Sequence, residues 1–280
     1  MIKLKIKKHI YGTLLFISLV TVLSLLAGCG KVPLTNRQQI LLVSDYEIQA
    51  LAAQQYTEIL SQSKLIRNTA DYQRVMRVGN RISGAVDNFV RSQGLSQYSS
   101  GYKWEFNLIE DDKSMNAFCM PGGKVAVYTG ILPVARDDAG LAVVLSHEIA
   151  HALAKHGEER LSQILLAQYG GAKLSEAIKD QPEATKKNVL LAFGIGANVG
   201  VLLPYSRLQE SEADRIGLAL MAYAGYDPHA ALNFWARMEK VETSGSPTFL
   251  STHPLSSERI KDIKAEIPEA MKYYGLGAKE

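Results

Sequence analysis

Hydrophobic residues recur at helical spacing between Asp137 and Gly157 and predict a long core helix. They form one buried stripe, made of Leu141, Val144, Leu145, Ile149, Ala152 and Leu153. Asp137 and Asp138 place negative charge in the first turn, where the helix dipole favours it. Lys155 and His156 place positive charge in the last turn, and Gly157 is expected to be a left-handed C-cap. We therefore expect His156 to be only a helix-end cation.

Helical patterns dominate the rest of the chain, and two short strands interrupt them. Helices are expected from Ser44 or Asp45, over 71–91, and from Pro204 to Gly225. Residues 102–109 and 124–128 alternate between polar and apolar side chains, as half-buried strands do, and the loop 121–123 leads into the second strand. The sequence thus predicts an α+β domain that is mainly helical, with a small β-sheet.

The uncharged segment Val189–Leu203 fits more than one structure. It is shorter than the roughly 20 apolar residues that span a bilayer. A buried helix packed closely through its glycines is the favoured interpretation. Because each glycine lowers helix stability by roughly 1 kcal/mol relative to alanine, the alternative is a mobile flap or a patch that touches a membrane or an envelope partner.

The N-terminus has the pattern of a bacterial lipoprotein signal peptide over residues 1–28. A lysine-rich start precedes an apolar run of roughly 14 residues, which ends in Leu26-Ala27-Gly28-Cys29. An uncleaved membrane anchor is the weaker alternative, since the run is short. By similarity to lipoproteins, Cys29 is expected to carry lipid. Gly30 stands where an Asp would favour the inner membrane, so an outer-membrane anchor facing the periplasm is expected.

Removal of residues 1–28 changes what charge and cysteine content imply. This segment has four Lys and no acidic residue, so 27 basic and 28 acidic residues remain and the net charge changes from +3 to about −1. The basic character therefore belongs to the targeting signal, and no nucleic-acid partner is expected. With Cys29 lipidated, Cys119 has no intrachain partner. A buried thiol is favoured over an intermolecular bridge.

The segment His147-Glu148-Ile149-Ala150-His151 lies in the middle of the predicted core helix. Residues four apart lie on one helix face, so both imidazoles can reach one metal ion. Glu148 is then beside the ion and can accept a proton from a metal-bound water, whose pKa zinc lowers to roughly 7. An accidental match is the alternative, but the rigid helix is the platform that such a site needs.

A catalytic zinc site requires a third protein ligand, and the best candidates lie in the segment 206–214. Glu210 and Asp214 are four residues apart on a predicted helix. One carboxylate can bind zinc while the other accepts the free N–H of a ligand histidine and fixes its tautomer. Spacing alone does not choose among Glu210, Glu212 and Asp214. A solvated acidic helix face is the alternative.

H-E-I-A-H followed by S-R-L-Q-E-S-E-A-D resembles the M48 family of zinc metallopeptidases, in particular its bacterial lipoprotein branch related to the mitochondrial Oma peptidase. The resemblance extends from about Val32 to Ile263. It includes the segments Asn116–Lys124, Gly225–Pro228 and Thr252–Leu255, with Arg259 shortly after. It implies a zincin-type metallopeptidase domain over residues 29–280, with the small sheet next to the H-E-x-x-H helix. An extended peptide can add to the edge of such a sheet, so protein substrates are expected.

The same resemblance implies roles for individual residues. His147, His151 and Glu210 would bind one Zn²⁺ per chain, and Glu148 would be the catalytic base. Asp214 would orient a ligand histidine without binding the metal itself, and Glu212 would be a bystander.

The Thr252-His253-Pro254 segment leaves two interpretations open. It is either a surface turn or a loop that returns to the cleft, where His253 supports the oxyanion or occupies the open zinc position at rest. The match to the family favours a site role, so His253 is predicted to be catalytic. Arg259 is a candidate for structural pairing or for contact with transition-state charge, and His229 is expected at the surface.

Together these features predict a zinc endopeptidase of the bacterial envelope. Its substrates would be misfolded or misassembled envelope proteins, and it can have envelope protein partners. The alternative is a chaperone-like assembly factor in which proteolysis is secondary or self-inhibited. A partner that depends on Val189–Leu203, and not on Glu148, would favour that alternative.

Overall fold

The fold was analysed on a computed structural model, which describes residues 29–169, 188, 192, 206–242, 248–255 and 257–278. Val189–Leu203 lies outside these residues except for Ala192, which is buried. The strands are β1 (Cys29–Lys31), β2 (Gln38–Ile40), β3 (Leu65–Ile66), β4 (Glu105–Ile109), β5 (Ala117–Met120) and β6 (Lys124–Tyr128). The helices are α2 (Asp45–Ser61), α3 (Ala70–Ser92), α4 (Leu132–Ala135), α5 (Asp138–Leu153), α6 (His156–Tyr169), α9 (Arg207–Tyr223), α10 (Ala230–Glu242), α11 (Thr248–Thr252) and α12 (Ser257–Ala270).

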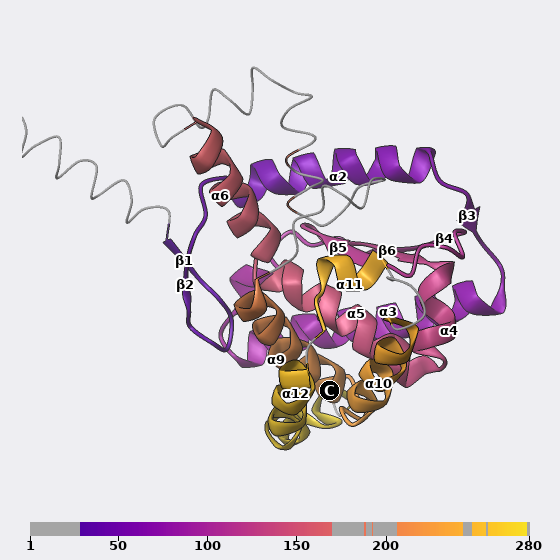
Figure 1. Cartoon of the computed structure of the whole chain (residues 1–280). Helices are drawn as coiled ribbons and strands as arrows, with labels where there is room; N and C mark the ends of the chain where they lie inside the picture. Colours follow the sequence, from indigo (N-terminus) through magenta and orange to yellow (C-terminus); the bar gives the residue numbers. More distant parts are fainter. Residues whose placement is uncertain are drawn as a thin grey trace, which may run out of the picture.

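The main sheet has the strand order β3-β4-β6-β5 and lies between two layers of helices (Figure 1). β4 runs parallel to β6, whereas β3 and β5 pair antiparallel with their neighbours. α2 covers one face of the sheet, and α3 and α5 pack against the other. The predicted class, mainly helical α+β with a small sheet beside the H-E-x-x-H helix, is confirmed. β5, at the sheet edge, is the strand that contacts α5.

A second sheet consists of β1 and β2, which pair as an antiparallel hairpin between Cys29 and Ile40. Its strands are only three residues long and lack a clear alternation, so the sequence pattern did not predict it. The hairpin lies beside α6 (Figure 1).

The helix starts follow from local capping. Ser44 accepts a hydrogen bond from the backbone N–H of Glu47, whose side chain accepts in return from the Ser44 N–H. Ser206 and Gln209 form the same box at the start of α9, and Asp137 caps α5. Each cap satisfies N–H groups that the first helical turn leaves without a partner. The predicted starts of α2 and α5 are therefore confirmed.

The predicted end of the core helix is wrong. α5 stops at Leu153, Lys155 takes the left-handed conformation with φ 55°, and a new helix, α6, begins at His156. Gly157 therefore lies inside α6 and caps nothing. Lys155 is held by an ion pair with Asp45 at 2.5 Å, which helps a non-glycine residue to keep this conformation.

α9 approaches α5 closely at Gly217. A Cβ atom on Gly217 would lie 3.2 Å from the backbone N and Cα of His147, so a larger residue would push the two helices apart. This contact places the acidic first half of α9 against the histidines of α5. The close packing at Gly217 therefore determines which side chains of α9 can reach a metal ion bound by α5.

The strand predictions hold with shifted bounds. β6 spans Lys124–Tyr128 as expected, whereas β4 begins only at Glu105. Gly122 and Gly123 connect β5 to β6 with φ of +80° and +79°, a conformation that favours glycine. Cys119 is a buried free thiol, as predicted. Within the described residues, no helix is long and apolar enough to cross a membrane.

Candidate metal centre

Two histidine side chains of α5 converge as the motif predicts. The Nε2 atoms of His147 and His151 lie 3.1 Å apart, and both residues are buried. Because the two residues are one helical turn apart, their rings leave the same face of α5. Both ring nitrogens therefore face one point in the site, as two ligands of one metal ion would.

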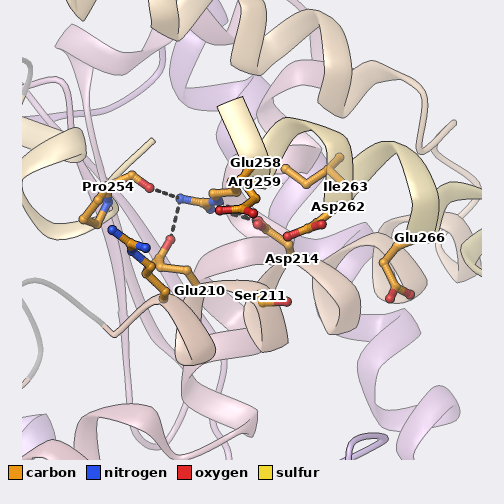
Figure 2. Close-up of a pocket in the computed structure, with 10 residues that line it drawn as sticks. Glu210, Ser211, Asp214, Pro254, Glu258, Arg259, Asp262, Ile263 and Glu266 are labelled. Atoms are coloured by element: carbon orange, nitrogen blue, oxygen red, sulfur yellow. Dashed lines mark hydrogen bonds and ion pairs between the residues drawn. The ribbon is translucent and has the colours of Figure 1, made fainter. Parts of the chain in front are cut away.

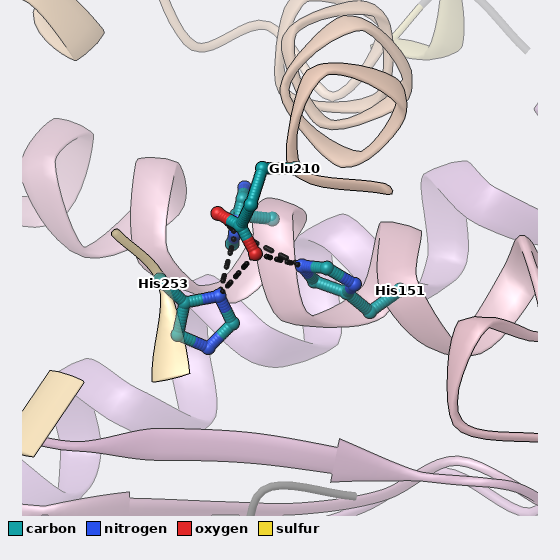
Figure 3. Close-up of side chains that lie close together, drawn as sticks. His151, Glu210 and His253 are labelled. Atoms are coloured by element: carbon teal, nitrogen blue, oxygen red, sulfur yellow. Dashed lines mark hydrogen bonds and ion pairs between the residues drawn. The ribbon is translucent and has the colours of Figure 1, made fainter. Parts of the chain in front are cut away.

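Glu210 reaches the same point from the first turn of α9. Its carboxylate oxygens lie 3.3 Å from His151 Nε2 and 3.5 Å from His147 Nε2. Figure 3 shows this carboxylate between the rings of His151 and His253. The buried carboxylate therefore comes from the downstream helix that sequence spacing had selected, and among the three acids considered it is Glu210 that points to both histidines.

His253, the residue directly after α11, is the fourth member of this group. Its Nδ1 lies 3.2 Å from His147 Nε2 and 2.9 Å from Glu210 Oε1, and the residue is 2% exposed. The interpretation of Thr252-His253-Pro254 as a surface turn is therefore wrong. Phe249 stacks on the His253 ring with centroids 4.5 Å apart, which fixes the ring in the site.

The four side chains fit a zinc ion. One nitrogen or oxygen from each of His147, His151, Glu210 and His253 lies within 4.8 Å of the others. Tetrahedral ligands with zinc bonds of roughly 2.0–2.1 Å are separated by about 3.3–3.4 Å, close to the distances found here. A set of three imidazoles and one carboxylate also favours zinc, because calcium and magnesium are bound mainly by oxygen atoms.

Glu148 lies beside this group. Its Oε1 is 3.4 Å from His253 Nε2 and has no hydrogen-bond partner among the residues that the structure describes. Burial raises the pKa of Glu148, although the nearby His253 and His147 act in the opposite direction. A carboxylate with a raised pKa, next to the metal ligands and outside their set, is suited to accept and return a proton.

One side of the site is held by a carboxylate and an arginine. His147 Nδ1 lies 3.0 Å from Asp214 Oδ1, and Arg259 donates to both oxygens of Asp214 at 2.7 and 2.9 Å. Arg259 also lies 2.6 Å from Glu210 Oε2 and stacks 4.0 Å over the Trp235 ring. Asp214 thus occupies the position expected of a residue that orients His147, and Arg259 pairs with carboxylates of the site.

These charges shift the pKa values of the buried groups. Burial lowers the pKa of His147, but hydrogen bonds to Asp214 and Glu210 outweigh it and raise this pKa to about 9. Burial raises the pKa of Glu210, yet the charges of Arg259 and His253 hold it well below its usual range. The carboxylate that faces the histidines is therefore ionised, as a zinc ligand must be.

One residue on the other side was misread from the sequence, and a second has a buried partner that the sequence did not predict. His156 is fully buried, with its Nδ1 2.9 Å from His151 Nδ1 and its Nε2 3.2 Å from Glu212 Oε2. His156 is therefore not a helix-end cation, and Glu212, predicted to be a bystander at the zinc, lies outside the metal-facing group and contacts His156. On a continuous helix, a residue five positions after His151 would point away from it; the break at Lys155 turns the chain so that His156 faces back.

A cavity of about 220 Å³ lies between α9 and α12 and is lined in part by Glu210, Asp214 and Arg259. Figure 2 shows Arg259 at its centre, bonded to Pro254 and to Glu210. Neither the two histidines of α5 nor Glu148 is among the lining residues next to Glu210, so the cavity reaches only the outer side of the site. His229, by contrast, lies at the surface with a 58% exposed side chain, as predicted.

Comparison with known proteins agrees with this geometry. A match to peptidase family M48 covers residues 79–267, which include α5, α9 and the His253 segment. The chain belongs to peptidase family M48. This confirms the predicted family and, at the level of the family, the predicted enzyme class of zinc metallopeptidases.

Individual relatives give the same result. The chain is 36% identical over 248 residues to the mitochondrial metalloendopeptidase OMA1 of Schizosaccharomyces pombe, covering 85% of this chain and 66% of the relative. It is 30% identical over 250 residues to the human metalloendopeptidase OMA1, covering 86% of this chain and 46% of the relative. A putative beta-barrel assembly-enhancing protease of Vibrio cholerae is 34% identical over 161 residues, with 55% and 32% covered. The chain thus matches between about one third and two thirds of the length of these relatives.

Proposed function

We propose that this chain is a zinc endopeptidase of the bacterial envelope that cleaves misfolded or misassembled envelope proteins. The observation that carries this proposal is the buried group of His147, His151 and Glu210 with the Glu148 carboxylate next to it. The names of two relatives, a putative beta-barrel assembly-enhancing protease of Vibrio cholerae and a beta-barrel assembly-enhancing protease of Yersinia pestis, favour an envelope substrate.

The residues of the site divide the reaction between them. His147, His151 and Glu210 would hold the zinc, which would supply Lewis-acid activation of a water for attack on a peptide carbonyl. Glu148 takes the proton of that water and then returns it to the leaving amine. Asp214 Oδ1 lies 3.0 Å from His147 Nδ1, so its negative charge favours the tautomer with the proton on Nδ1 and with Nε2 free to bind. β5, the sheet edge next to α5, is the place where an extended substrate can add by backbone hydrogen bonds.

Comparative proteomics of envelope fractions tests the natural function. Cells that carry Glu148→Gln should accumulate specific envelope proteins that wild-type cells degrade, and direct cleavage of those proteins by the purified wild type should follow. If the two strains have identical envelope proteomes, and cells with Glu148→Gln have the same phenotype as wild-type cells, the chaperone-like alternative would be favoured instead.

The closed arrangement of His253 favours a self-inhibited resting state. Its Nδ1 completes the ligand group, and the Phe249 N–H donates to the carbonyl of Met115, 2.9 Å away and two residues before β5. The segment from α11 to His253 therefore occupies both the fourth metal position and a backbone acceptor at the start of the substrate edge. A substrate must displace this segment before cleavage.

His253→Ala tests that role. The variant should retain zinc, because three ligands remain, and it should cleave an unfolded test protein, or itself, faster than the wild type. Zinc content and initial cleavage rates of the two purified proteins provide the measurement. If His253 instead supports the oxyanion, the rate should fall roughly ten- to a thousandfold, and that result would remove the resting-ligand role.

The attachment to the membrane is tested at Cys29. Cys29 begins β1, directly after the proposed signal peptide. Cys29→Ala should abolish labelling with palmitate analogues and should block lipoprotein processing, while the fold of residues 30–278 stays unchanged. Unchanged labelling, or a mature N-terminus at another residue, would contradict the lipid anchor and with it the proposed outer-membrane location.

A further inference from the structure

His151 has a support of its own that reaches from the metal group to the N-terminal hairpin. The contacts run from His151 Nδ1 to His156 Nδ1 at 2.9 Å, and from His156 Nε2 to Glu212 Oε2 at 3.2 Å. Arg37 Nε then donates to both oxygens of Glu212 at 3.0 and 2.9 Å, and Thr35 Oγ1 donates to Oε1 at 2.7 Å. Arg37 and Thr35 lie in the turn between β1 and β2.

The direction of these hydrogen bonds follows from the chemistry of a neutral imidazole, which has one N–H and one free nitrogen. His151 Nε2 faces His147 and Glu210, so it must be free if a metal binds there, and Nδ1 must carry the proton. His156 Nδ1 must then accept this proton's hydrogen bond, and His156 Nε2 must donate to Glu212. The carboxylate thus sets the tautomer of His156, which in turn sets the tautomer of His151.

From this geometry we infer that His156, Glu212 and Arg37 are positioning residues for the metal ligand His151, and that the hairpin turn is a structural part of the zinc site. The inference rests on the proposed zinc site and adds residues that act on it only through His151. It also gives α9 a further task, since Glu210, Glu212 and Asp214 serve the metal, His151 and His147 respectively.

Arg37 is held firmly enough for this task. Besides Glu212, it binds both carboxylate oxygens of Glu159 in α6 at 2.7 and 2.8 Å. The Glu212 side chain is 4% exposed and that of Arg37 is 21% exposed, so the pair is shielded from most solvent. Bidentate contacts of a planar guanidinium fix orientation as well as charge. A displacement of the hairpin would therefore release Glu212 and loosen His156.

The contacts of the two ligand histidines are matched. His147 has Asp214 and Arg259, and His151 has Glu212 and Arg37 with His156 between them. His156 stands between His151 and Glu212 and so lengthens this second chain of contacts. The hairpin residue Arg37, 122 positions before Glu159, can therefore take part in the site. Partners of this kind orient ligand histidines in metal sites generally.

Zinc affinity of the full-length chain, measured by competition with a chromophoric chelator, tests the inference. His156→Leu, which removes the acceptor for His151, should weaken zinc binding by roughly ten- to a hundredfold. His156→Asn places an amide oxygen as many bonds from the backbone as Nδ1 and should recover most of that loss. Glu212→Gln should weaken binding by about tenfold. The visible spectrum of the cobalt-substituted protein should shift in His156→Leu and return toward wild type in His156→Asn.

Glu159→Gln is the matched control. It breaks the other ion pair of Arg37 with the same chemical change as Glu212→Gln, but it keeps the contact of Glu212 Oε2 with His156 Nε2, so that His156 loses only the more distant charge of Glu159. Its zinc affinity should stay within about threefold of wild type, below the range for ligand-orienting partners. Equal losses in Glu159→Gln and Glu212→Gln, or wild-type affinity in His156→Leu and Glu212→Gln, would overturn the inference. If His156→Leu does not fold, the two Glu→Gln variants still decide. A wild-type chain without zinc affinity would instead refute the proposed metal site itself.

Discussion

Glu148→Gln should retain one zinc per chain and the wild-type fold, and should lose at least about a hundredfold in proteolytic rate. This loss is the lower range for general acid–base catalysis, and it corresponds to about 2.7 kcal/mol of transition-state stabilisation. The amide has the volume of the carboxylate but accepts no proton, and Glu148 is outside the group of metal-facing atoms. Cleavage of an unfolded test protein and metal analysis of the same preparation measure both effects.

Glu158→Gln provides a matched control for this experiment. Glu158 is also buried, and burial raises its pKa to about 8, so its carboxyl group is largely protonated at neutral pH. Replacement by the neutral amide therefore changes little at Glu158 but removes an acid–base group at Glu148. Near-normal turnover by Glu148→Gln, in a preparation free of other proteases, would exclude Glu148 from the mechanism.

The local parts of this site could be predicted from the sequence. His147 and His151 share a helix face because of their spacing alone, and the acids of α9 were recognisable as a group on a second helix. Which acid faces the metal was not decided by spacing. It depends on how α9 rotates against α5, which is fixed by the close contact at Gly217.

The support of His151 could not be predicted, for two physical reasons. The first is the left-handed Lys155, which ends α5 early and turns His156 back toward His151. Lys155 is neither a glycine nor a proline, so the sequence gave no indication that the helix breaks there. The second is the distance in sequence: Arg37 and Glu212 are 175 positions apart, and no periodic pattern reports such a contact. A buried charge network across the fold becomes visible only when the elements are in place.

The two arginines of the site explain why so many charges can be buried together. Arg259 is shared by Asp214 and Glu210, and Arg37 by Glu212 and Glu159. Each guanidinium offers several donors in one plane, so it can form hydrogen-bonded ion pairs with two carboxylates at once. Loss of one partner leaves the opposite charge buried, which is more costly than loss of the pair. Substitutions that probe metal binding here should therefore keep volume and hydrogen-bonding capacity.

Glu210→Gln is such a substitution, and it should remove most of the bound zinc. The amide preserves the volume but replaces the one negatively charged ligand of the group with a neutral oxygen, and Arg259 keeps both oxygens of Asp214 and the Pro254 carbonyl as partners. The fold should therefore survive while the site changes from one carboxylate and three imidazoles to imidazoles alone. Metal content after dialysis against a weak chelator, together with the circular dichroism spectrum, measures the two effects.

Asp214→Asn is the comparison that gives this result its meaning. Its side chain contacts His147 Nδ1 and not the metal-facing atoms, so zinc affinity should fall by roughly ten- to a hundredfold and not be abolished. The order of zinc retention should thus be wild type, then Asp214→Asn, then Glu210→Gln. A Glu210→Gln protein that holds zinc as firmly as Asp214→Asn would mean that His147, His151 and His253 suffice to bind it. The carboxylate would then belong to the positioning of His253, whose Nδ1 lies 2.9 Å from it, and not to the metal.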